Sequence, residues 1–140
     1  MTVLIDTNVV MDVVFNNSKL IDGSRAILDH AEQKRFAGYI SASAITDIFY
    51  LSKKRLGKKV AKEVVKELLQ IYYPATVTDN HIYQALDLDW SDFEDSVQYI
   101  VGESISADYI VTRNTKDYTS GTIPVVTPEE FIQAIADINN

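Results

Sequence analysis

The sequence contains no cysteine and only two histidines, His30 and His81. Disulfide bonds, thiolate zinc sites and a cysteine nucleophile are therefore excluded, and little material exists for a histidine-rich metal site or a Ser-His-Asp triad. No apolar run reaches the ~18 residues that cross a bilayer, and no charged-then-apolar leader opens the chain. We therefore expect one domain of 140 residues that lies in the cytoplasm and has no membrane partner.

Several enzyme signatures are also missing. The chain has no G-x-x-x-x-G-K-[ST] phosphate loop and no G-x-S-x-G nucleophile elbow. Its first apolar run ends in a single acid, Asp6, followed by Thr-Asn, and lacks the paired acids of phospho-aspartyl phosphatases and receiver domains. A hydrophobic fraction of 46% and a charged fraction of 24% are typical of a folded domain and exclude a disordered chain.

Basic residues are concentrated in one segment although the net charge is −7. Seven of the thirteen lysines and arginines lie between Lys53 and Lys66, whereas residues 71–140 hold two basic residues and twelve acids. A polyanion could contact the basic segment, and the acidic half would attract cations. A solvated helix face with ordinary acidic loops explains the same distribution and is the simpler interpretation of charge alone.

Short apolar runs alternate with amphipathic segments along the chain. The runs predict strands at Val3–Ile5, Gly38–Ile40, Thr76–Val77, Tyr109–Thr112 and Pro124–Val126. The segments predict helices at about 9–14, 24–34, 43–56, 58–72, 80–86, 92–104 and from Thr127 onward. This order predicts an α/β fold, a three-layer α/β/α sandwich with a central, mainly parallel sheet.

Local signals mark where some of these helices begin and end. Ser91-Asp92-Phe93-Glu94 matches a capping box, which predicts that Ser91 begins the helix before the Tyr109 strand. Thr127-Pro128-Glu129-Glu130 predicts a helix start with proline at its first position. Gly57 is expected to end one helix and Pro74 the next.

Carboxylates follow or precede the predicted strands at several points. Asp6 follows the first strand, Asp117 follows the Tyr109 strand, Asp47 lies early in the helix after Tyr39, and Asp92 and Asp95 lie early in another helix. In parallel sheets, ligands bind beyond the carboxyl ends of the strands. Converging carboxylates repel one another unless a hard divalent cation neutralises them, and Mg²⁺ and Mn²⁺ prefer such oxygens. The pattern predicts a site for phosphoryl chemistry.

Each acid also has a purely structural interpretation. Asp6 could cap the next helix, and Asp92 could stabilise a helix dipole. A helical wheel places Asp95 opposite the apolar stripe of its helix, which fits a solvated face, and Asp47 could also lie on a polar face. Asp117 could belong to a turn. For each acid taken alone, the structural interpretation is at least as good as the functional one. The placement of all of them at strand ends favours a functional site.

The motifs Val3-Leu4-Ile5-Asp6-Thr7-Asn8-Val9, Asp92-Phe93-Glu94-Asp95 and Ala107 to Tyr118 together resemble those of PIN-domain ribonucleases, in particular the prokaryotic VapC-like branch. The resemblance spans Val3 to about Phe131, so it implies a single PIN-like domain over residues 1–140. It implies a Mg²⁺- or Mn²⁺-dependent enzyme that hydrolyses phosphodiester bonds of single-stranded RNA.

The resemblance also implies roles for individual residues. The first, second and third acids of the family fall on Asp6, Asp47 and Asp95, with Asp92 adjacent. The second is usually glutamate, so Asp47 is shorter by a methylene. The fourth falls on Asn114, with Asp117 three residues further on. Asn8, Thr112 and Asn114 would orient the metal-binding carboxylates without contacting the metal themselves.

The leading hypothesis is therefore metal-assisted RNA hydrolysis. Asp6 and Asp95 would hold the cation, Asp92, Asp117 and Asn114 would complete or support the site, and Asp47 would position or deprotonate the attacking water. RNA-backbone contacts are expected from Arg113, Lys53, Lys54, Arg55 and Lys58. Tyr50, Tyr99 or Tyr118 could stack on bases, although packing in the core is the more common role for most of the eight tyrosines.

Two other outcomes stay open. The chain could be a binding module for RNA or protein that keeps the fold but not the chemistry, as the loss of charge at Asn114 suggests. It could also be a toxin silenced by a cognate antitoxin protein. Apolar helices in the first half could supply a homodimer face, although a packed core explains them as well.

Overall fold

The computed structural model describes residues 1–16 and 21–139, which form a parallel sheet covered by helices on both faces. The sheet has the order β3-β2-β1-β4-β5. Its strands are β1 (Thr2–Ile5), β2 (Ala37–Ser41), β3 (Tyr73–Ala75), β4 (Tyr109–Val111) and β5 (Val125–Val126). Every neighbouring pair is parallel. The predicted α/β sandwich is confirmed.

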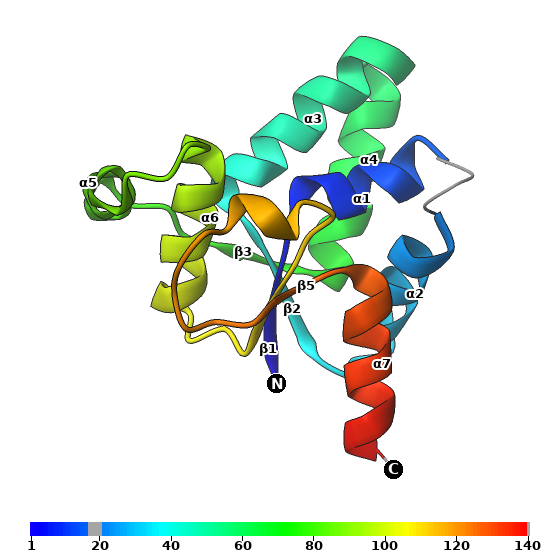
Figure 1. Ribbon diagram of the computed structural model, residues 1–140. Helices are drawn as coiled ribbons and strands as arrows, with labels where there is room; N and C mark the ends of the chain where they lie inside the picture. Colours follow the sequence, from blue (N-terminus) through cyan, green and yellow to red (C-terminus); the bar gives the residue numbers. More distant parts are fainter. Residues whose placement is uncertain (17–20, 140) are drawn as a thin grey trace.

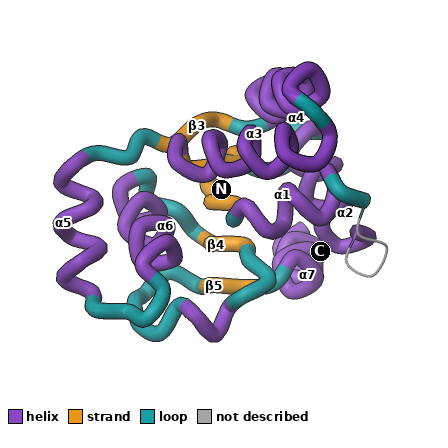
Figure 2. The backbone as a smooth tube through the Cα atoms, turned by 90° about the horizontal axis from the view of Figure 1, so that it is seen from above, coloured by secondary structure: helices purple, strands orange, loops and turns teal. Residues whose placement is uncertain are grey.

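Helices occupy both sides of this sheet, as the view from above shows (Figure 2). They are α1 (Thr7–Val14), α2 (Ile21–Glu32), α3 (Ala42–Leu56), α4 (Lys58–Ile71), α5 (Asp79–Leu88), α6 (Phe93–Ser104) and α7 (Pro128–Asn139). Helices α5 and α6 cover one face, and α1, α2, α4 and α7 lie on the other (Figures 1 and 2). Helices α3 and α4 form a hairpin that extends beyond the sheet (Figure 1).

The apolar side chains of β1 divide between two cores, because successive residues of a strand point to opposite faces. Val3 and Ile5 belong to the core beneath α1, α2 and α7, whereas Leu4 belongs to the core beneath α5 and α6. All three side chains are fully buried. A central parallel strand is buried on both faces, which explains why β1 is an unbroken apolar run.

Two details differ from the sequence-based predictions. The strand predicted at Thr76–Val77 is wrong, because the third strand is Tyr73–Ala75 and contains Pro74. Proline lacks a backbone N–H, and β3 can include it because β3 is an edge strand. Helix α4 therefore ends at Ile71, before Pro74 is reached. The capping box at Ser91 is also wrong, since Asp92 is the N-cap and its Oδ1 accepts a hydrogen bond from Asp95 N at 3.1 Å.

No helix among residues 1–16 and 21–139 is long and apolar enough to span a membrane.

Candidate active site

The strand order reverses beside β1, and this reversal creates the site. The chain runs outward through β1, β2 and β3, then returns to place β4 on the other side of β1. Loops leaving β1 and β4 therefore diverge and open a crevice beyond their carboxyl ends. Asp6 follows β1 directly, and Thr112 follows β4 directly. Backbone hydrogen bonding joins the two ends, since Asp6 N donates to Val111 O at 2.9 Å.

Asp6 is buried and held in place by its side chain. It occupies the N-cap position of α1, where the backbone N–H groups of Thr7 and Asn8 lower the pKa of its carboxyl, but its side chain does not make a regular capping hydrogen bond. Its Oδ2 instead accepts hydrogen bonds from Thr112 Oγ1 at 2.8 Å and from the Tyr118 hydroxyl at 3.3 Å. Burial raises the pKa of Asp6, and these hydrogen bonds oppose the rise without cancelling it.

Thr112 is oriented in turn by Asn8. Asn8 Nδ2 donates to Thr112 Oγ1 at 3.2 Å, and Asn8 Oδ1 accepts from Arg113 N at 3.2 Å. The backbone N–H of Asn114 also donates to Thr112 Oγ1, at 3.1 Å. A chain of hydrogen bonds thus runs from Asn8 through Thr112 to the Asp6 carboxylate and fixes its orientation.

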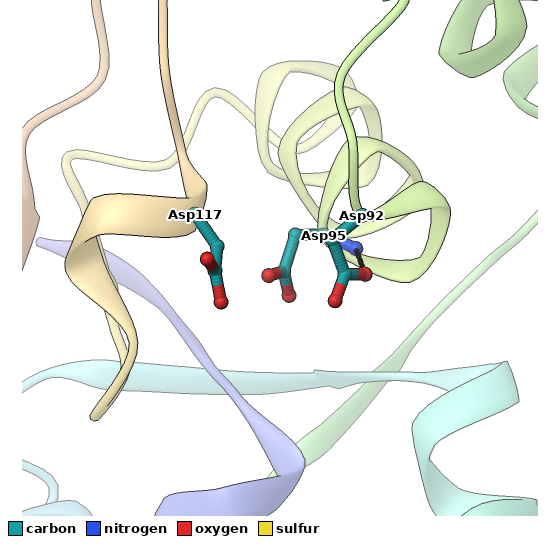
Figure 3. A group of neighbouring side chains, drawn as sticks. All are labelled: Asp92, Asp95 and Asp117. Atoms are coloured by element: carbon teal, nitrogen blue, oxygen red, sulfur yellow. Dashed lines mark hydrogen bonds between the residues drawn. The ribbon is translucent and has the colours of Figure 1, made fainter.

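Three further carboxylates meet beside Asp6. Oxygens of Asp92, Asp95 and Asp117 all lie within 4.8 Å of one another. Asp92 and Asp95 come from the start of α6, and Asp117 comes from a 3-10 turn (Thr115–Asp117) after β4 (Figure 3). The three side chains point toward one another from segments more than twenty residues apart in sequence (Figure 3).

Asp95 lies where the charges are most concentrated. Its residue is only 8% exposed, so the solvated face that the helical wheel favours is wrong. Desolvation, together with the negative charges of Asp6, Asp92 and Asp117, raises the pKa of Asp95 to about 7. The same burial and the carboxylates of Asp6 and Asp95 raise the pKa of Tyr118, whose hydroxyl therefore stays protonated and donates.

A cleft opens from these carboxylates. Its volume is about 570 Å³, and its polar walls include Asp6 and Asp95. We call it the acidic cleft. Asp47 lines it from α3, and Glu94 lines it from α6. Partial burial, the nearby Asp47 carboxylate and a hydrogen bond with Asp47 raise the pKa of Glu94.

Glu94 was not among the residues predicted from the sequence. Asp47 is a methylene shorter than the glutamate that the family resemblance leads one to expect, and Glu94 reaches the same part of the cleft. Asn114 is exposed and carries no charge, whereas the Asp117 carboxylate, three residues further on, belongs to the carboxylate group. The negative charge missing at Asn114 is therefore present in the site, one 3-10 turn later.

Arg113, expected to contact RNA, is instead bound to acids of the protein. Its Nε lies 3.0 Å from Asp12 Oδ2 and its Nη1 lies 2.8 Å from Glu129 Oε2. Its Nη2 also donates to Ser24 Oγ at 3.0 Å. Burial alone would lower the pKa of Arg113, but these acids outweigh it and raise the pKa. The guanidinium joins α1, α2 and α7 to the end of β4, which is a structural role.

We predict that Arg113→Met lowers the free energy of unfolding by about 3–5 kcal/mol, because it leaves the buried Asp12 carboxylate unpaired. Urea denaturation measures the change. Glu129→Gln is the matched control: Glu129 is exposed, and loss of a surface pair costs no more than about 1 kcal/mol. An Arg113→Met variant that is as stable as the wild type but binds RNA more weakly would contradict the structural role of Arg113 and support its predicted contact with RNA.

The other predicted RNA contacts lie on the α3–α4 hairpin. Lys53, Lys54, Arg55 and Lys58 are all exposed. The Arg55 guanidinium lies over the Phe15 ring, 4.4 Å from its centroid. Among the tyrosines considered for stacking, Tyr50 is 66% exposed in the acidic cleft. Tyr99 and Tyr118 are buried, which is the packing role expected for most of the tyrosines, so of these three only Tyr50 is placed to stack on a base.

Comparison with known proteins identifies the fold family. A model of the PIN domain matches residues 2–116. The chain belongs to the PIN-domain family. This PIN domain is 26% identical to Ribonuclease VapC1 of Aquifex aeolicus (strain VF5), over 94% of this chain and 93% of that protein. The predicted family is confirmed.

Solved structures share the arrangement of this PIN domain. VapBC2 from Rickettsia felis, bound to a DNA fragment from their promoter, aligns with a TM-score of 0.71 and 14% identity, over 89% of this chain and 97% of that chain. A toxin–antitoxin complex from Klebsiella pneumoniae aligns with a TM-score of 0.66 and 18% identity, over 90% and 97%. At such identities the likeness shows a common fold.

Proposed function

We propose that this PIN domain is a metal-dependent endoribonuclease that hydrolyses phosphodiester bonds of single-stranded RNA. The observation that carries the proposal is the group of Asp92, Asp95 and Asp117 beside the buried Asp6. Like charges so close together are unfavourable, as the raised pKa of Asp95 indicates. A divalent cation would remove this cost. The similarity to Ribonuclease VapC1 supports the same activity.

The donor set fits Mg²⁺ or Mn²⁺ better than other metals. All candidate ligands are carboxylate oxygens, which these hard cations prefer, and the chain has no thiolate to offer a softer metal. Asp6, Asp92, Asp95 and Asp117 would hold the cation. When bound, it stabilises negative charge on the phosphoryl group.

Other residues of the protein position the metal-binding carboxylate and the attacking water. Thr112 and Tyr118 keep the Asp6 carboxylate fixed by hydrogen bonds, which reduces reorganisation during the reaction. Asp47 and Glu94 also line the acidic cleft and share a hydrogen bond. They orient the attacking water, and the carboxylate of the pair that is not protonated accepts its proton. No covalent enzyme intermediate is required.

We also propose that the protein is the toxin of a toxin–antitoxin pair. The proposal is supported by the structural similarity to VapBC2 of Rickettsia felis and to the toxin–antitoxin complex of Klebsiella pneumoniae. Co-expression with the product of an adjacent small open reading frame checks it: we expect the two proteins to co-purify and RNA cleavage to be suppressed.

A homodimer remains part of the proposal. Leu51 and Leu56 of α3 and Val60 and Leu69 of α4 are exposed apolar residues on the hairpin. Sedimentation velocity of the isolated protein measures the oligomeric state. A protein that is monomeric at all concentrations would contradict the homodimer and leave the proposed ribonuclease activity unaffected.

RNA leaving the cleft would meet the lysines of the hairpin. Tyr50 and Leu51 line the cleft, and Lys53 and Lys54 follow within one turn of α3. We predict that the triple variant Lys53→Gln, Lys54→Gln, Lys58→Gln reduces the slope of log K against log salt by about 2, because each single-strand phosphate contact contributes about 0.7. Fluorescence anisotropy with labelled RNA measures it.

The control for this triple variant removes the same number of positive charges outside the α3–α4 hairpin. Arg25, Lys34 and Arg35 are exposed, and the last two precede β2 at the amino end of the sheet. Their replacement by glutamine is expected to leave the slope nearly unchanged. Equal effects from both variants would show that RNA is attracted by overall charge rather than by the hairpin.

Cleavage of single-stranded RNA with added Mn²⁺ tests the main proposal. Calorimetry with Mn²⁺ distinguishes an enzyme from a module that has kept only the fold. An enzyme should show metal-dependent heat that disappears in Asp6→Asn, whereas an inactive module should show little heat in either protein.

A further inference from the structure

Gln98 of α6 lines the acidic cleft and has an amide oxygen without a hydrogen-bond partner among the described residues. The residue is 7% exposed and lines the cleft together with Asp6, Glu94 and Asp95. Its Oε1 is buried and makes no hydrogen bond with any residue that the structure describes. In the described part of the chain, the other such oxygen is Ser52 Oγ, which is not part of the cleft.

A lone buried amide is unfavourable unless something binds it. Leaving a buried acceptor unsatisfied costs free energy, whereas an apolar side chain of similar volume avoids this cost. Gln98 therefore destabilises the free protein relative to methionine or leucine at the same position. Residues that cost stability in this way concentrate at binding sites.

The surroundings of Gln98 indicate what kind of group it binds. Glu94 and Gln98 are four residues apart, so they share one face of α6 at a spacing of about 6 Å along the axis. The cleft that Gln98 lines also has apolar walls, which include Val77, Ile82 and Val97. An anion would gain nothing from a neutral amide among apolar groups, but a flat, uncharged, hydrogen-bonding group fits such a pocket.

A nucleobase is such a group. A carboxamide offers an acceptor beside two donors, and its soft terminal torsion lets it present either to a ligand. Bases carry adjacent donors and acceptors along their edges, which glutamine can bind in a bidentate manner. Two exposed aromatic side chains, Phe93 and Tyr50, line the same cleft and can stack on bases.

We propose that Gln98 binds the edge of an RNA base next to the scissile phosphate and thereby contributes to base preference. This inference rests on the proposed ribonuclease function. Its test uses the four nucleosides, which are uncharged and need neither metal nor cleavage. Titrating each into the metal-free protein, we expect the side-chain amide resonance of Gln98 to shift saturably with at least one nucleoside, and not with ribose 5-phosphate.

Gln98→Met supplies the matched variant, with exposed Gln84→Met on α5 as its control. Loss of a bidentate base contact should weaken nucleoside binding by roughly 5- to 150-fold. It should also raise KM for RNA with little change in kcat and relax base preference at one position. The melting temperature of Gln98→Met should equal or exceed that of the wild type, because an unpaired amide has been removed.

The outcomes separate this inference from the function beneath it. Nucleoside binding at Gln98 without RNA cleavage by the wild type would leave base binding by Gln98 standing and would remove the ribonuclease proposal, together with the position next to a scissile phosphate. RNA cleavage with no shift at Gln98, and with the same KM in Gln98→Met, would overturn the inference alone. A melting temperature of Gln98→Met well below that of Gln84→Met would also overturn it, by showing that the amide stabilises the fold.

Discussion

Asp95→Asn is expected to lower the rate of RNA cleavage by about 1,000-fold or more. Asp95 lies between Asp92, Asp117 and Asp6, so its charge is central to any cation held there. Asparagine keeps the size of the side chain but removes the charge. Stabilisation of phosphoryl charge is worth several kcal/mol, and about 1.4 kcal/mol corresponds to a factor of ten in rate. Single-turnover cleavage of a fluorescent RNA with Mn²⁺ measures the loss.

Asp6→Asn should show a loss of similar size, since its carboxylate is held by Thr112 and Tyr118 in the same site. Asp87→Asn is the control, because Asp87 is an exposed aspartate of α5 that does not belong to the carboxylate group. We expect it to cleave at the wild-type rate. Equal activity in all of these proteins would place the chemistry elsewhere or reveal a contaminating nuclease.

Most of the fold could be predicted because its strongest signals are local. Val3-Leu4-Ile5 is apolar on both faces since β1 is central and buried. The strand predicted at Thr76–Val77 was wrong because pairing between neighbouring strands outweighs the strand preference of individual residues there. Tyr73 and Ala75 pair with Tyr39 and Ser41 of β2. That register is a tertiary contact, and a proline in the strand hides it from the sequence.

Site residues could be predicted from the sequence where they follow parallel strands, because the carboxyl ends of such strands lie at one edge of the sheet. Asp6 and Asp117 follow parallel strands, so their convergence follows from topology. Asp95 was harder, because a helical wheel assumes one face in solvent. In α6 the run from Asp95 to Gly102 is buried without interruption, since the helix packs against both the sheet and α5. Gln98 became informative only through its missing partner, which no sequence pattern reveals.

The metal-free protein is expected to lose stability as pH rises from about 4 to 7. The pKa of Asp95 is about 7 in the fold, against an ordinary value of 3.8. Between these values the folded state holds a proton that the unfolded state has lost, so unfolding becomes easier with rising pH. The effect is complete by about pH 8, once Asp95 has ionised in the folded state as well. Asp92 is exposed and Asp117 is half-buried, so solvent screens their charges, and we expect about 2 kcal/mol.

Asp95→Asn isolates this contribution because it has no carboxylate to ionise. We expect the wild type to lose about 2 kcal/mol relative to Asp95→Asn between pH 4 and pH 8, in urea denaturation with a chelator present. Saturating Mn²⁺ should reverse the trend, because a cation binds the ionised carboxylates and adds about 2.7 kcal/mol at a hundred times its Kd. Parallel pH profiles for the two proteins would mean that the carboxylates do not repel one another, and that the site has no need of a cation.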